Sequence, residues 1–159
     1  MKVVLEEVHD KVGEKHILKY QVPGDDFTRA GEASSSLKNT LKMLGVDNSA
    51  IRKIAIAMYE GEINMVIHAN GGNIEVEITD EDVLMTLVDT GPGIADIPQA
   101  MEEGFSTAPD EVRSLGFGAG MGLPNMKRST DELEITSVVG EGTKVVMKVC
   151  FNNQRPASS

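Results

Sequence analysis

The sequence predicts an α+β fold, a two-layer α/β sandwich in which a mostly antiparallel, mixed sheet carries its helices on one face. Short β-prone runs come in hairpin-like pairs, and two amphipathic stretches separate the first pair from the second. The chain has 159 residues, of which 40% are hydrophobic and 25% charged, as in a globular protein. We therefore expect one domain over residues 1–150 and a frayed tail over 151–159.

The first elements are expected to be a hairpin and a helix. Residues 3–9 and 15–22 are β-prone runs around the turn-like segment DKVGE. The segment PGDD then supplies turn and N-cap residues, and apolar side chains recur at helical spacing from Phe27 to Leu44. This helix should end near Gly45.

A second helix and a second strand pair follow. DNS is a capping signal, and apolar positions fit a helix from Ala50 to about His68, which ANGGN ends. The segment NIEVEIT alternates strictly, as in a strand with one covered face, whereas VLMTLV is continuously apolar and suits a central strand.

The last third of the chain begins with loops and ends in a third strand pair. After the loop DTGPGI we expect a short helix over 96–103, a long glycine-rich connection to Gly122 and a helix from Pro124. The strands LEITSVV and TKVVMKV are joined by GEG. Loops as long as this connection are usually binding loops or lids, which predicts a binding function for the segment.

Charge and composition exclude several classes of function. A net charge of −10 argues against nucleic acid, which requires clustered Lys and Arg, but it does not argue against a mononucleotide. No apolar run could span a membrane, and MKVVLEEVHD is too short and too acidic for a signal peptide, so we expect a cytoplasmic protein. The single Cys150 allows no internal disulfide, and no paired spacing indicates structural zinc.

A polar stripe interrupts the second helix. Glu60, Asn64 and His68 are four residues apart and share one helical face. The alternative is an ordinary solvated face. However, Asn is a poor helix former, and Gly61 costs about 1 kcal/mol relative to Ala in a helix interior. We therefore interpret the stripe as a site that something approaches closely.

Two further glycine-containing segments indicate a nucleotide. Asp89 ends the most apolar strand, and the glycines that follow it leave the backbone uncovered. Its carboxylate could bind an adenine amine. The alternative is an ordinary turn with an Asx-type hydrogen bond. Gly116, Gly118, Gly120 and Gly122 alternate before a helix, so that free amides and a helix N-terminus could cradle phosphate. The alternative for this segment is a flexible linker, since it matches neither a Walker A loop nor a Rossmann fingerprint. The polar stripe, the Asp89 loop and the alternating glycines together favour a nucleotide site.

These motifs resemble the GHKL ATPase superfamily. The resemblance covers roughly residues 15–150 and rests on E-x-x-x-N in a helix, D-x-G-x-G-I after a strand, G-x-G-x-G-L before a helix, and GEGT near the end. FSTAPDEVRS followed by GMGLPNMKRSTDELEI looks most like the stand-alone serine/threonine kinases of bacterial partner-switching systems, which include anti-sigma factors and switch-protein kinases. The resemblance implies a Bergerat ATP-binding fold with ATP and Mg²⁺ as cofactors.

The resemblance also implies roles for single residues. Glu60 would be the general base, Asn64 would ligate magnesium, and Asp89 would bind the adenine amine. Arg113 would approach the γ-phosphate. The other positions that the resemblance assigns to the nucleotide are His68, Gly91, Gly93, Ile94, Gly118, Gly120, Met121, Gly122, Leu123 and Thr143.

The implied function is a kinase that phosphorylates a small partner protein of the anti-anti-sigma or switch-protein type. A sigma factor or another regulator is a further candidate partner, as is a second copy of the chain. The glycine-rich lid GFGAGMGL is closer to switch kinases than to many anti-sigma factors, and the chain has no room for a phosphorylated-His helical hairpin. The alternatives are a binding module switched by ATP and ADP with little catalysis, and a structural domain with a degenerate site.

Overall fold

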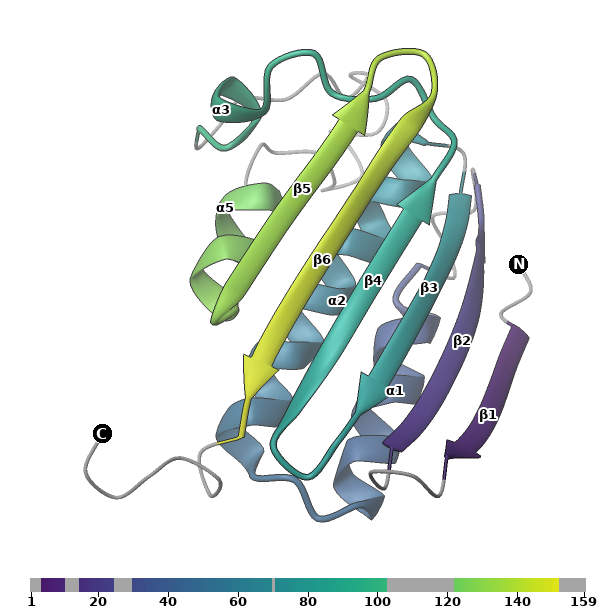
Figure 1. Cartoon of the computed structure of the whole chain (residues 1–159), viewed down its shortest axis with the longest axis vertical. Helices are drawn as coiled ribbons and strands as arrows, with labels where there is room; N and C mark the ends of the chain where they lie inside the picture. The colour runs from purple at the N-terminus through teal and green to yellow at the C-terminus, as the bar shows by residue number, and fades with distance from the viewer. Residues whose placement is uncertain (1–3, 11–14, 25–29, 70, 103–121, 152–159) are drawn as a thin grey trace.

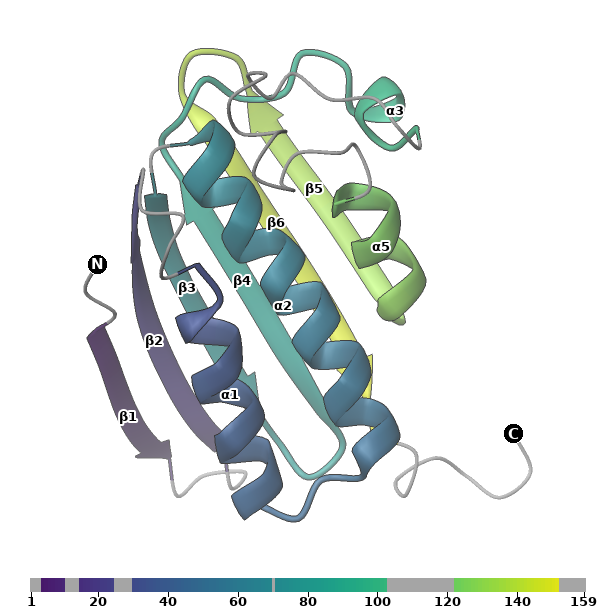
Figure 2. The same cartoon turned by 180° about the vertical axis from the view of Figure 1, so that it is seen from behind.

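The computed structural model shows one antiparallel sheet with helices on one of its faces (Figures 1 and 2). It describes residues 4–10, 15–24, 30–69, 71–102 and 122–151. The strand order is β1-β2-β3-β4-β6-β5, and every pair of neighbours is antiparallel. The strands are β1 (Val4–Asp10), β2 (Lys15–Pro23), β3 (Gly71–Ile78), β4 (Asp82–Asp89), β5 (Glu132–Val138) and β6 (Gly142–Cys150). The predicted α+β fold class is confirmed.

The main helices lie on the same side of the sheet (Figure 2). They are α1 (Glu32–Met43), α2 (Asn48–His68) and α5 (Gly122–Ser129), while the short α3 (Ile97–Ala100) lies at one end of the sheet. The long helix α2 crosses the middle of the sheet, with α1 on one flank and α5 on the other (Figure 2). It therefore contacts both neighbouring helices as well as the strands. None of the helices in the described part of the chain is long and apolar enough to cross a membrane.

The hydrophobic core lies between the sheet and these helices. Alternate residues of each inner strand point into it, as β4 shows: Val83, Met85 and Leu87 are buried. On the other face of β4, Leu84 is only partly buried and Val88 is 41% exposed. The continuously apolar VLMTLV segment is thus a central strand, as predicted, with helices over one face only.

Helix α1 begins later than the sequence predicts. We expected a start just after PGDD, whereas Ala30 and Gly31 form a turn and the helix begins at Glu32. Gly31 has a φ of 102°, in the left-handed region that favours glycine, and it provides no side-chain cap. Phe27 lies outside the described residues.

The cap of α1 comes instead from a residue in α2. The carboxylate of Glu62 accepts hydrogen bonds of 3.1 Å each from the backbone N–H groups of Ala33 and Ser34. Glu62 is fully buried, and a carboxylate at a helix N-terminus is favoured by the helix dipole. Burial raises the pKa of Glu62, and the hydrogen bonds from α1 lower it in part. The start of α1 therefore depends on α2.

Gly61 explains how closely α2 packs on the sheet. A Cβ atom at this position would overlap with Cδ2 of Leu87 in β4. The close approach that the sequence predicted at Gly61 is therefore made by the protein's own sheet. Glycine costs helix stability here but allows the central helix to contact β4 directly.

We expect Gly61→Ala to destabilise the fold. Overpacking should cost about 1–3 kcal/mol, more than the gain of about 1 kcal/mol in helix propensity. The free energy of unfolding in urea measures the change. In a Leu87→Ala background, where the overlapping methyl is absent, the same substitution should cost much less. An equal cost in both backgrounds would contradict this account.

We expect Glu62→Ala to lower the free energy of unfolding by about 2 kcal/mol, because the substitution leaves two helical N–H groups without their acceptor. Glu62→Gln is the intermediate control, because the two N–H groups bond to different carboxylate oxygens and the glutamine amide keeps an acceptor for only one of them. It should lose less stability than Glu62→Ala, measured by urea unfolding at neutral pH. Equal losses for Ala and Gln would show that the acceptor is not what matters.

Candidate nucleotide-binding site

One end of the candidate site lies where α2 meets the start of α5. A Cβ on Gly122 would lie 3.2 Å from both amide atoms of Asn64 and 3.3 Å from Oε2 of Glu60. The structure thus brings together three of the predicted site residues. The N-terminus of α5 lies beside the polar stripe of α2, and its backbone N–H groups are suited to an anion.

Glu60 is a partly buried carboxylate at this end. Burial raises its pKa, and a hydrogen bond with the Asn125 side chain lowers it in part. A carboxylate with a raised pKa is a stronger base than one exposed to water. The site therefore holds a group suited to accept a proton.

The other end of the site lies where β4 ends. Oδ1 of Asp89 accepts hydrogen bonds from the backbone N–H groups of Gly91, at 3.0 Å, and Thr143, at 3.2 Å. The Asx-type bond considered as an alternative is therefore present, but it uses one carboxylate oxygen. Within the described part of the chain, Oδ2 of Asp89 accepts no hydrogen bond. This carboxylate oxygen can accept a hydrogen bond.

The glycines after Asp89 allow tight packing of their loop. A Cβ on Gly91 would lie 2.6 Å from Cα of Ala69, and one on Gly93 would lie 2.6 Å from the carbonyl oxygen of Val138. Gly93 also has a φ of 80°. We predicted that these glycines leave the backbone uncovered; instead, they let the loop contact α2 and the hairpin of β5 and β6.

His68 is the end of the polar stripe that lies nearer to Asp89. It is partly buried at the last turn of α2, where burial lowers its pKa and the nearby charge of Asp89 raises it in part. Glu60 and His68 are eight residues apart, which corresponds to about 12 Å along a helix. The stripe therefore runs from the Gly122 end to the Asp89 end of the site.

The remaining predicted residues have different surroundings. Leu123 belongs to the hydrophobic core, and Ile94 is partly buried against it. The backbone N–H of Ile94 donates to Oγ of Ser137, a residue that no motif in the sequence singled out. Arg113, Gly118, Gly120 and Met121 lie outside the described residues.

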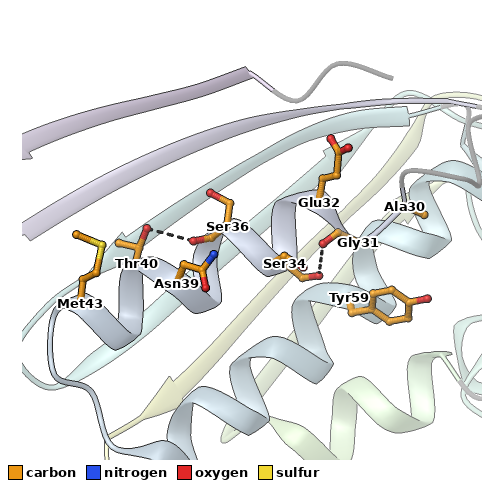
Figure 3. Close-up of a pocket in the computed structure, with 10 residues that line it drawn as sticks. Ala30, Gly31, Glu32, Ser34, Ser36, Asn39, Thr40, Met43 and Tyr59 are labelled. Atoms are coloured by element: carbon orange, nitrogen blue, oxygen red, sulfur yellow. Dashed lines mark hydrogen bonds between the residues drawn. The ribbon is translucent and has the colours of Figure 1, made fainter.

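A separate groove lies over α1 (Figure 3). Its volume is about 700 Å³. Hydroxyl and amide side chains of α1 form half of its lining, and Tyr59 of α2 lies at one end. Ser34 donates to the carbonyl of Gly31 and Thr40 to that of Ser36, so both hydroxyls bond within their own segment. None of the predicted site residues lines this groove, and sequence periodicity did not predict it.

Comparison with known proteins shows the family to which the chain belongs. Residues 50–153 match the family described as "Histidine kinase-, DNA gyrase B-, and HSP90-like ATPase". The chain therefore belongs to this family of ATPases, which confirms the predicted superfamily. The match begins at α2 and includes both ends of the candidate site.

Individual relatives show which members of this ATPase family the chain resembles. The chain is 37% identical to "Serine/threonine-protein kinase RsbT" of Bacillus subtilis (strain 168), over 68% of this chain and 78% of the relative. It is 38% identical to "Anti-sigma F factor" of Clostridium beijerinckii, over 64% and 72% respectively. A similar factor of Clostridium acetobutylicum is 33% identical, over 80% and 85%. These relatives confirm the group that the motifs predicted.

The raised pKa of Glu60 predicts a pH-dependent effect of Glu60→Gln on stability. A carboxyl with a raised pKa in the folded state contributes stability below its usual pKa and loses it as the pH rises through the raised value. The variant should therefore match the wild type near about pH 4 and be more stable at about pH 8. Urea unfolding at both pH values measures this, with Glu75→Gln on an exposed strand position as the charge control. A difference that does not change with pH would contradict it.

Proposed function

We propose that this chain is an ATP-dependent protein serine/threonine kinase that phosphorylates a small partner protein. The observation that carries the proposal is the meeting of Glu60, Asn64 and Gly122 at one end of a site whose other end is Asp89. Family membership and the kinase named among the relatives support it. We propose the cytoplasm as the place of action.

The residues present fit ATP and magnesium. The missing Cβ of Gly122 leaves space beside Asn64 and Glu60, and Oδ2 of Asp89 can accept from an exocyclic amine. Mg²⁺ takes one or two protein oxygens and completes its shell with phosphates and water. Asn64 can supply such an oxygen, and no cluster of three or more His, Cys, Asp or Glu residues within the described ranges offers a larger cage.

Each residue then has a defined task. When bound, ATP would supply the phosphoryl group to a serine or threonine oxygen and leave as ADP, and Mg²⁺ would neutralise charge on the phosphate oxygens. Glu60 would accept the proton that leaves the partner's hydroxyl, and Asn64 would hold the metal. Asp89 would hold the adenine ring of ATP in place through its exocyclic amine.

The other proposed contacts follow the two ends of the site. We assign the end at Asp89, which we call the base end because it would bind the adenine base, to His68, Gly91, Gly93, Ile94 and Thr143. We assign the phosphate end to Arg113, Gly118, Gly120, Met121, Gly122 and Leu123. The proposed partner is a protein of the anti-anti-sigma or switch-protein type, with a sigma factor, another regulator or a second copy of the chain as further candidates.

A nucleotide-switched binding module is the second candidate function. Glu62 of α2 caps α1, and the groove over α1 ends at Tyr59, next to Glu60 in the chain. The helix that carries the proposed base thus also supports a surface suited to a partner. This alternative is preferred if ATP changes the affinity for a partner while no phosphoprotein accumulates.

We expect Asp89→Asn and Glu60→Gln to separate binding from catalysis. Loss of the Asp89 carboxylate should weaken Mg-ATP binding at least about tenfold, because hydrogen bonds to charged groups contribute about 1.5–3 kcal/mol. Glu60→Gln should bind ATP almost as well as the wild type but transfer phosphate about 10²–10⁴-fold more slowly. Calorimetry and transfer of labelled γ-phosphate to co-purifying partner proteins measure the two effects.

The wild-type transfer rate should also fall as the pH drops below the raised pKa of Glu60, because a protonated base cannot accept the proton. Glu75→Gln, on an exposed position of β3, should change neither binding nor transfer. Unchanged transfer by Glu60→Gln would remove Glu60 as the base. Failure of the wild type to bind Mg-ATP would reject the function as a whole.

A further inference from the structure

Three hydroxyl and backbone groups converge on Ser137 at the base end of the site. Ser137 in β5 and Thr143 in β6 are cross-strand partners, and their hydroxyl oxygens lie 2.9 Å apart. The backbone N–H of Ile94 donates to Ser137 Oγ at 2.7 Å. Ser137 Oγ also lies 3.1 Å from the carbonyl oxygen of Gly142, which can only accept. Ser137 thus joins the loop after β4 to the hairpin of β5 and β6.

Counting protons fixes the direction of the bond between the two hydroxyls. A serine hydroxyl has one proton and two lone pairs. The carbonyl of Gly142 takes the proton, and the N–H of Ile94 occupies one lone pair. Only a lone pair remains for Thr143, so Thr143 must donate to Ser137. The oxygen of Thr143 then has no proton left to offer and can act only as an acceptor.

Thr143 lies directly beside Asp89. The two residues are cross-strand partners of β6 and β4, and the backbone N–H of Thr143 donates to Oδ1 of Asp89 at 3.2 Å. Oδ2 of Asp89 is also an acceptor. This edge of the site therefore presents two neighbouring acceptors, the carboxylate and the threonine oxygen, and it suits a ligand edge that carries donors.

We propose that Ser137 is a positioning residue that selects a 6-amino purine over a 6-oxo purine by fixing the Thr143 hydroxyl as an acceptor. The inference rests on the proposed nucleotide function and deepens it. An exocyclic 6-amino group donates to acceptors, whereas a 6-oxo group brings a third acceptor to the same place. A site built of oriented polar groups rejects the mismatched ligand because its own groups are left unpaired.

The test compares ATP with inosine triphosphate, in which an oxo group replaces the 6-amino group. Calorimetry or equilibrium dialysis gives the dissociation constant of each nucleotide. The wild type should prefer ATP. In Ser137→Ala the threonine hydroxyl is free to turn and donate, so the preference should fall about tenfold, the equivalent of one hydrogen bond. Ser137→Thr keeps a hydroxyl on β5 and should retain most of the preference.

Two further variants separate selection from mere support of the loop. Thr136→Ala, the neighbouring exposed position of β5, should leave the preference unchanged. In a Thr143→Val background, where the hydroxyl to be oriented is absent, Ser137→Ala should cause no further loss of preference. A purely structural Ser137 would instead weaken both nucleotides equally in either background.

The outcomes distinguish this inference from the proposed function. A wild type that prefers ATP, with the preference unchanged in Ser137→Ala, overturns the role of Ser137 alone. A wild type that binds neither nucleotide overturns the proposed function and this inference together. A preference that falls in Ser137→Ala but not further in the double variant supports both. Thermal unfolding of each variant shows that the compared proteins are folded.

Discussion

The contact between α2 and β4 is the constraint on which the rest of the structure depends. Because Gly61 has no side chain, α2 can lie against Leu87. The residues on either side of Gly61 then point to different neighbours: Glu60 lies near the start of α5, and Glu62 bonds to the start of α1. One glycine thus sets the position of the central helix relative to the sheet and to both flanking helices.

The two carboxylates beside Gly61 differ both in burial and in partners, since Glu62 is fully buried and Glu60 only partly buried. Glu62 accepts from two backbone N–H groups, whereas the hydrogen bond that lowers the pKa of Glu60 comes from a single side chain, that of Asn125. The first arrangement stabilises a helix start. The second leaves a carboxylate with less compensation, which costs stability but suits a base. The same helix turn therefore serves both structure and chemistry.

Local sequence patterns predicted the fold class, the strand pairs, the end of α1 near Gly45 and the residues of the polar stripe. The patterns failed where a residue far away in the sequence determines the local structure. The start of α1 depends on Glu62, which lies 28 residues beyond Ser34 in the chain. They predicted a close approach at Gly61 but not its partner, which is Leu87 of the sheet. Ser137 carries no motif, and only the pairing of β5 with β6 brings it to Thr143. Contacts between cross-strand partners can be predicted only when the register of the two strands is known.

The dependence of α1 on Glu62 has a consequence for the order of folding. Short helices in water are marginal by themselves, and α1 has no side-chain cap of its own. Its two capped N–H groups gain their acceptor only after α2 has formed and docked. Helix α2, in contrast, begins with its own cap, since Asp47 accepts from the N–H of Ala50 at 2.9 Å. The chain should therefore complete α2 before α1, although α1 comes first in the sequence.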